Sequence, residues 1–336
     1  MNRRSHHDIH ACSGQKSLAI RMLDNPHMQT ILPALLSSAR AVYTRTEIIS
    51  LPDGDEVSLH WSGPAARGDM ARDTLIILPG MQGGLNSACV RTMLQATDNL
   101  GKSAVVLSHR GACKPNRLSK FYHAGHIEDL AWLVQRLSSL ARATGLYAVG
   151  FSLGGVMLTR FLAEYFSAPI QRAVTVSMPF CLGATAKVAN LGMNRLYQRR
   201  ILASYKTVAK AKQCFPEYRR RNRFLNRVRS IRDFDRLYTA PINGFASVEE
   251  YYEVCSAKRH LPSVTHPLLL IVAQDDPLIP LDTFPIVTSL RNDVTALFFA
   301  TGGHLGFYQI REGKFWPFWL DNVVDFLWGQ QNESIF

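Results

Sequence analysis

The sequence predicts an α/β protein built on a mostly parallel central sheet with helices on both faces. Short, wholly apolar runs, such as residues 74–78 and 268–273, have the length of buried parallel strands. Segments with apolar residues at helical spacing separate these runs, which is the order of βαβ units. The chain has 336 residues, 47% of them apolar, and is long enough for one large α/β domain or for a domain plus an insertion.

The predicted strands and helices alternate along the chain. Strands are expected at residues 46–51, 57–61, 74–78, 104–107, 146–149, 173–176, 268–273 and 295–299. The first two are joined by Pro52-Asp-Gly-Asp55, which is typical of a hairpin. Asn86 can cap a helix that continues through Leu94, and further helices are expected at 127–137, 156–162 and 318–328. Residues 25–33 mix polar and apolar side chains, and elementary physics assigns them no clear role.

A serine stands at the sharpest predicted turn of the chain. The apolar run from Leu146 meets Gly150-Phe-Ser-Leu-Gly154 and then the apolar segment from Val156, which indicates a strand, a tight turn and a helix. Glycines two residues to either side let the strand and the helix pass close to Ser152, so its hydroxyl is left exposed. This context favours a nucleophile over an idle serine in a structural turn.

A serine hydroxyl is a poor nucleophile at neutral pH, so it needs a histidine base and a carboxylate that orients the base. In this type of site they follow in the order serine, acid, histidine. Asp275 and Asp276 stand at the C-terminal end of strand 268–273, where open α/β sheets keep their sites. His304 follows the next strand in a glycine-rich loop, Gly302 to Gly306. An ordinary turn and a structural histidine are the alternatives for each feature alone, but together with Ser152 they favour a triad.

Hydrolysis of an acyl group also needs hydrogen-bond donors for the oxyanion that develops. The backbone N–H of Leu153, directly after the serine, is one predicted donor. The loop after strand 74–78 is expected to supply the other, which we assign to the N–H of Met81. Because both donors belong to the backbone, the side chain of Met81 carries little information.

The formal net charge of +12 is concentrated in one segment. Residues 187–236 contain 15 Lys or Arg and 3 acidic residues, an excess that equals the net charge of the chain. An apolar stripe at helical spacing predicts a basic amphipathic helix there, within an all-helical insertion at 179–261. The stripe consists of Met193, Leu196, Tyr197, Ile201, Tyr205 and Val208. Such charge can attract anionic lipid, an acidic substrate or nucleic acid, or it can simply be solvated. Nucleic acid is disfavoured, because the basic run Arg219 to Arg223 lacks the interleaved aromatic residues of a nucleic-acid module.

The remaining residues of chemical interest indicate no cofactor and no metal. The chain has six cysteines, at positions 12, 89, 113, 181, 214 and 255. Because none of them forms a CxxC pair, a zinc site and a disulfide framework are not indicated, and the cysteines suit a reducing cytosol. The groups His6-His7-x-x-His10 and His123-x-x-His126 lack partners at metal-binding spacing. Residues 1–22 contain no apolar signal region, and no stretch has the length of a membrane span, so we expect a cytoplasmic protein.

The chain resembles the α/β-hydrolase superfamily, and more narrowly its YheT-like (AB-hydrolase-domain) esterase family, from Asn25 to about Leu327. The resemblance rests on segments that follow one another in the same order. They are Asn25-Pro-His-Met-Gln-Thr30, Leu51-Pro-Asp-Gly54, Pro115-Asn-Arg117, Tyr122-His-Ala-Gly125, Glu128-Asp-Leu130, Gly150 to Gly155, Ala240-Pro241, Gly244-Phe245, Asp275-Asp-Pro277 and Gly302-Gly-His304. Pro79 departs from the pattern, because many relatives have histidine before the glycine of the oxyanion loop, and this puts the geometry of that loop in question.

The resemblance implies an α/β-hydrolase fold with a tail at residues 1–24, a core at 25–178 and 262–336, and the 179–261 insertion as a lid. It implies a serine hydrolase with Ser152, Asp276 and His304 in the triad positions and an acyl-enzyme intermediate. The expected substrates are short- to medium-chain acyl esters or acylglycerol-type lipid esters, with peripheral contact between the basic lid and anionic lipid. The alternatives are an acyl thioesterase and a catalytically silent member that binds a partner through its insertion. The complete set of triad residues favours an enzyme.

Overall fold

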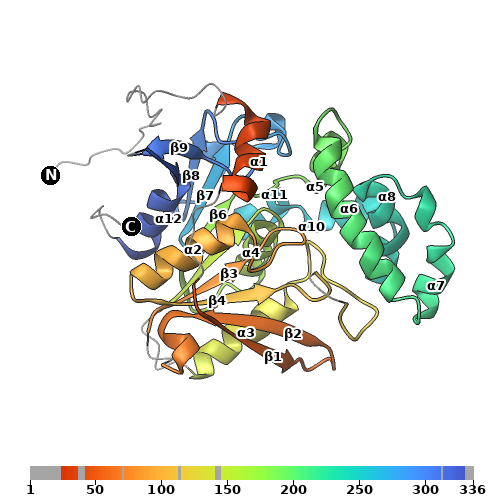
Figure 1. The fold of residues 1–336 in the computed structure, drawn as a ribbon, viewed down its shortest axis with the longest axis horizontal. Coiled ribbons are helices and arrows are strands. Elements are labelled where there is room, and N and C mark those ends of the chain that lie inside the picture. Colours follow the sequence, from red (N-terminus) through yellow and green to blue (C-terminus); the bar gives the residue numbers. More distant parts are fainter. Residues whose placement is uncertain are drawn as a thin grey trace.

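The computed structural model describes residues 24–36, 42–69, 72–112, 115–140, 145–311 and 313–329. The predicted 1–24 tail lies outside the described residues except for Asp24, and so do Cys12, Cys113 and the group His6 to His10. The described chain contains an eight-stranded sheet in the order β1-β2-β4-β3-β5-β6-β7-β8 (Figure 1). Its strands are β1 (Thr44–Ser50), β2 (Glu56–Ser62), β3 (Thr74–Leu78), β4 (Ser103–Ser108), β5 (Leu146–Phe151), β6 (Ile170–Val176), β7 (Leu268–Ala273) and β8 (Val294–Phe299).

The sheet is mostly parallel, as predicted. Strands β1 and β2 form the antiparallel hairpin, with Ser50 opposite Glu56, and β2 also runs antiparallel to β4. All neighbouring pairs from β4 through β8 are parallel. The carboxyl ends of β3, β5, β7 and β8 therefore meet at one edge of the sheet, which is where α/β sheets carry their sites.

Helices cover both faces of the sheet because side chains alternate along each buried strand. Ile76 and Leu78 of β3 pack in one core with α3 (Glu128–Leu140) and α4 (Leu153–Glu164). Leu75 and Ile77 of the same strand pack in a second core with α2 (Ala88–Asn99) and α12 (Trp319–Trp328). The prediction of helices on both faces is confirmed.

All the elements between β6 and β7 are helices, and this part of the chain projects to one side of the sheet (Figure 1). Its longest element is α6 (Asn194–Ala211), which follows α5 (Leu182–Val188). The shorter elements are α7 (Pro216–Asn222), α8 (Ile231–Phe234), α9 (Ala240–Ile242), α10 (Val248–Cys255) and α11 (Ala257–His260). A cluster of aromatic rings, including Tyr205, Phe234 and Tyr238, holds these helices together and meets Phe121 of the core.

The structure differs from the sequence-based expectations in three places. The predicted apolar stripe is buried only in part: Met193, just before α6, and Leu196, in its first turn, are 47% and 55% exposed. Asn86 does not cap α2, which begins at Ala88 after Ser87. The elements that were not predicted include α1 (Pro26–Leu36) and the small hairpin of β9 (Tyr308–Arg311) and β10 (Lys314–Pro317).

Candidate active site

Ser152 occupies the sharp turn between β5 and α4. Its backbone has φ 50° and ψ −118°, a conformation that L-residues rarely adopt. A side chain at position 150 would come within 2.6 Å of the Gly154 carbonyl oxygen, and one at position 154 within 2.3 Å of the Leu78 carbonyl oxygen. The glycines on either side are therefore required by close approach of the strand, the turn and the helix, as the sequence pattern suggested.

The structure brings Ser152, His304 and Asp276 together from three separate segments. The Nε2 atom of His304 lies 2.9 Å from the Oγ of Ser152. On the other side of the ring, Nδ1 lies 2.9 and 3.2 Å from the two carboxylate oxygens of Asp276. The Asp276 side chain is fully buried and that of His304 is largely buried. Because a carboxylate only accepts hydrogen bonds, Nδ1 carries the proton and Nε2 is free to accept one from the serine hydroxyl.

The two adjacent aspartates have different partners. Oδ1 of Asp276 also accepts hydrogen bonds from the N–H groups of Leu278 and Ile279, which fix the carboxylate in place. Oδ1 of Asp275 accepts the Gly303 N–H at 2.9 Å, so this side chain braces the loop that carries His304. Burial raises the pKa of Asp275. Only Asp276 meets the imidazole ring.

The loop after β3 lies against the serine. A Cβ added to Gly80 would be 3.3 Å from the Cβ of Ser152, so a side chain there would crowd the serine. Met81 and Leu153 both line the cavity in front of Ser152. Among the backbone hydrogen bonds of the described turns and loops, none is donated by Met81 or Leu153. The two residues predicted to supply the donors thus both lie at this cavity.

Two residues that sequence reasoning missed hold this loop. The hydroxyl of Tyr122 accepts the N–H of Gln82, whose φ of 57° is unusual for a residue other than glycine. Nε2 of His109 lies 2.8 Å from the Pro79 carbonyl oxygen, and the His109 ring stacks on Tyr122 at 5.0 Å. Burial lowers the pKa of His109, so the ring is neutral and donates from Nε2. This hydrogen bond holds the carbonyl group of Pro79, the residue at which the chain departs from the family pattern.

A cavity of about 350 Å³ opens in front of Ser152. Ser152, His304 and Met81 line it from the core, and helices α5 and α6 supply much of the remaining wall. The residues of the insertion that line it are Pro179, Leu182, Thr185, Ala189, Tyr197, Gln198, Arg200, Ile201 and Ile231. Most of these are apolar, which suits an acyl chain.

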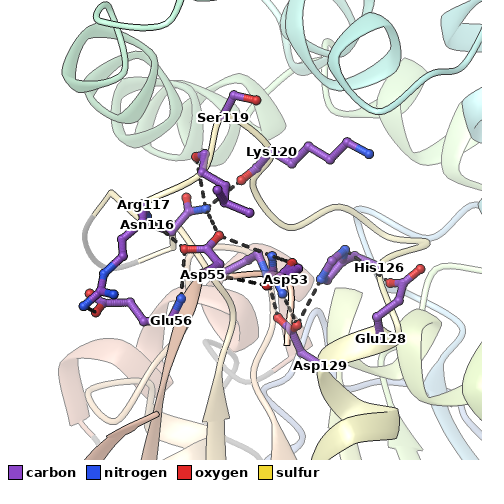
Figure 2. A network of polar contacts seen from close by, with 12 residues as sticks. Asp53, Asp55, Glu56, Asn116, Arg117, Ser119, Lys120, His126, Glu128 and Asp129 are labelled. Atoms are coloured by element: carbon purple, nitrogen blue, oxygen red, sulfur yellow. Dashed lines mark hydrogen bonds and ion pairs between the residues drawn. The ribbon is translucent and has the colours of Figure 1, made fainter. Parts of the chain in front are cut away.

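A buried ionic network explains several of the family-like segments (Figure 2). Arg110, 4% exposed, donates to Asp53 at 2.7 Å and Asp55 at 3.2 Å in the hairpin turn, and to Asp129 at the start of α3. Asn116 donates to Asp55 as well. Burial alone would raise the pKa of Asp129, but hydrogen bonds from His126 and Arg110 hold it at about 2. The network fastens the hairpin to the core and does not reach Ser152.

The other histidines and the cysteines of the described chain show no metal cluster. The part of the chain that the structure describes contains no group of three or more His, Cys, Asp or Glu side chains that could hold a metal ion. His123 packs against Phe245 and Tyr251, and burial lowers its pKa to about 3. Burial also raises the pKa of Cys89 to about 12, which makes its thiol a poor nucleophile. None of the described helices has both the length and the apolar character that a bilayer span requires.

Comparison with known proteins finds relatives along most of the chain. The family described as the alpha/beta hydrolase fold matches residues 73–309. YheT of Escherichia coli (strain K12), named as a candidate esterase, is 36% identical over 93% of this chain and 95% of its own length. Phospholipase ABHD3 of Mus musculus is 31% identical over 86% of this chain and 71% of its own length. A solved esterase of Pyrococcus furiosus shares the fold, with a TM-score of 0.55 and 18% identity over 85% of this chain and 92% of that chain.

Proposed function

The chain belongs to the alpha/beta hydrolase fold family, in its YheT-like esterase branch, and from this premise we propose that it is a serine hydrolase that cleaves carboxylic esters. The hydrogen-bonded series from Asp276 through His304 to Ser152 is the observation that carries the proposal. Such a series activates a hydroxyl for attack on a carbonyl carbon. The names of the relatives, which include an esterase and a phospholipase, favour an ester over other acyl compounds.

In the proposed reaction, Nε2 of His304 takes the proton of Ser152 as the serine oxygen bonds to the carbonyl carbon of the ester. Asp276 stabilises the imidazolium that forms, and the N–H groups of Met81 and Leu153 donate to the oxyanion. The intermediate then expels the alcohol, which receives the proton from His304, and leaves an acyl-enzyme on Ser152. Water, deprotonated by His304, attacks the acyl-enzyme, and the acid is released as His304 returns the proton to the oxygen of Ser152.

We take the insertion at 179–261 as a lid, on the ground that α5 and α6 line the cavity in front of Ser152. A mostly apolar cavity of about 350 Å³ suits a short- to medium-chain acyl group or one chain of an acylglycerol-type lipid. Leu191, Met193 and Leu196 are exposed at the tip between α5 and α6, among the exposed cations Lys187, Arg195 and Arg199. This combination favours peripheral contact with an anionic lipid surface.

The decisive experiment compares Ser152→Ala with the wild type on p-nitrophenyl esters of increasing chain length. Loss of the serine should lower kcat by roughly a millionfold and abolish labelling by a fluorophosphonate. Ser139→Ala, at an exposed serine of α3 whose hydroxyl donates to the Arg136 carbonyl, is the matched control and should change neither. An acyl-thioester series run beside the esters identifies the preferred leaving group. A Ser152→Ala variant that keeps a tenth of wild-type turnover would exclude Ser152 as the nucleophile.

A further inference from the structure

Helix α1 lies against the loop that carries His304, although the helix and the loop are far apart in the sequence. The helix begins with a well-formed cap, in which Oδ1 of Asn25 accepts the N–H groups of His27 and Met28. Pro26 occupies the first helical position, where its missing N–H costs nothing. The segment 25–30, whose role the sequence left open, therefore forms a defined first turn.

Two glycines of the loop that carries His304 leave room for the backbone of this helix. A Cβ at position 303 would lie 2.4 Å from the Pro26 carbonyl oxygen, and one at position 306 would lie 2.1 Å from the Gln29 carbonyl oxygen. Both distances are far below any real van der Waals contact, and both neighbours are backbone atoms that cannot turn aside. The backbone of α1 and the backbone of the loop are thus in direct contact on both sides of His304.

Thr30 holds the backbone of His304 itself. Its hydroxyl donates to the Pro26 carbonyl at 2.7 Å and accepts the His304 N–H at 3.0 Å. A hydroxyl has one hydrogen and two lone pairs, so donation to Pro26 directs its lone pairs toward His304. The three groups form a short series of hydrogen bonds that polarise one another and end at the histidine.

Gln29 holds the other end of the loop. Its side chain, 2% exposed, accepts the Tyr308 N–H at 2.8 Å and donates to the Tyr308 carbonyl at 2.9 Å. Between these anchors, Leu305 and Phe307 have φ of 66° and 54°, values that strain the backbone of a residue other than glycine. A loop with two such residues keeps its conformation only where its surroundings impose it.

We propose that Gln29 and Thr30 are positioning residues for His304, which hold its imidazole between Ser152 and Asp276. This inference rests on the proposed serine hydrolase function. Neither side chain bonds to Nε2 or Nδ1: Thr30 holds the backbone of His304, from which the ring projects, and Gln29 holds the backbone of Tyr308 at the end of the same loop. A displacement of about 1 Å at a catalytic group can cost on the order of a hundredfold in rate, so loss of either anchor acts on kcat.

The test removes the Thr30 hydroxyl while preserving the shape of the side chain. Thr30→Val should lower kcat on a p-nitrophenyl ester by about tenfold to a hundredfold, leave KM within about twofold, and slow fluorophosphonate labelling of Ser152 in parallel. Thr30→Ser should restore both rates, because it restores the acceptor for His304. Thr207→Val is the matched control, because Thr207 also donates to the carbonyl four residues earlier, on an exposed turn of α6.

Hydrogen exchange measured on the same variants separates this inference from the proposed function. Thr30→Val and Gln29→Met should both increase exchange within residues 302–308, whether or not the protein hydrolyses the ester. A wild type that a fluorophosphonate does not label at Ser152 would count against the proposed function. Unchanged exchange at 302–308 together with unchanged kcat would overturn the positioning role, and a raised KM at constant kcat would make Thr30 a substrate contact instead.

Discussion

Asp275 and Gly303 are joined by a hydrogen bond of 2.9 Å from the Gly303 N–H to Oδ1 of the carboxylate. The next residue, Asp276, faces the imidazole of His304 instead. Successive side chains leave the end of β7 in different directions, so one aspartate braces the histidine loop and the other reaches the ring. This division of roles leads to the first prediction.

Asp276→Asn should lower kcat on the order of ten-thousandfold, because an amide cannot stabilise the imidazolium and favours the wrong tautomer of His304. Asp275→Asn should lose much less, because its amide oxygen can still accept the Gly303 N–H. The measurement is kcat for both variants on one p-nitrophenyl ester, after circular dichroism has shown equal folding. The opposite order of the two losses would contradict the assignment of Asp276.

Tyr122→Phe should lower kcat by about tenfold to a hundredfold, because the Gln82 N–H loses its acceptor and the oxyanion loop is no longer held. Tyr218→Phe is the matched control, since this buried tyrosine donates to the Ser119 carbonyl, away from that loop. Both variants should lose about 1–3 kcal/mol of unfolding free energy. Equal kcat values for the two variants would show that Tyr122 only stabilises the fold.

Asp235→Asn should change how stability depends on pH. Burial raises the pKa of Asp235 to about 6, while Thr239 and Tyr252 donate to it. The folded protein binds this proton more tightly than the unfolded chain, whose value is near 3.8. The stability that the neutral carboxyl contributes is therefore complete below about pH 4 and is lost as the pH rises through 6.

Urea unfolding of the variant and the wild type between pH 4 and pH 8 tests this effect. The quantity to compare is the difference between their free energies of unfolding, from which the contributions of the other titrating groups cancel. The free energy of unfolding of Asp235→Asn should rise relative to that of the wild type as the pH rises, by up to about 3 kcal/mol at pH 8. The gain should be complete near pH 7. Parallel stability profiles for the two proteins would exclude a raised pKa at Asp235.

Charge reversal at the tip between α5 and α6 should weaken binding to anionic vesicles. The combined variant Lys187→Glu, Arg195→Glu and Arg199→Glu should lose most co-sedimentation at low salt, since each cation contributes about 1 kcal/mol near such a surface. It should spare turnover of a small soluble ester. The control reverses Arg219 and Arg220 of α7 and Arg223 just after it, which are also exposed. Equal losses for the two triple variants would mean that total charge alone drives binding.

Local patterns in the sequence were enough to predict the strands of the sheet, the helices on both faces and the turn at Ser152. Alternation, helical spacing and glycine placement act over a few residues, so they can be seen without a structure. The same patterns singled out Ser152 and His304, because each stands on a glycine-rich turn after a strand. Together with the resemblance to known hydrolases, they also led to the prediction of Asp276 as the acid.

Only the tertiary structure decided what the segment 25–30 does. Gln29 bonds to Tyr308, 279 residues away, and Thr30 to His304, 274 residues away. Likewise, the braces of the oxyanion loop and the partners of Arg110 come from segments whose proximity arises when the sheet forms and its loops meet at one edge. Sequence spacing carries no record of such distances, because hydrogen bonds between remote segments depend on how the whole chain packs.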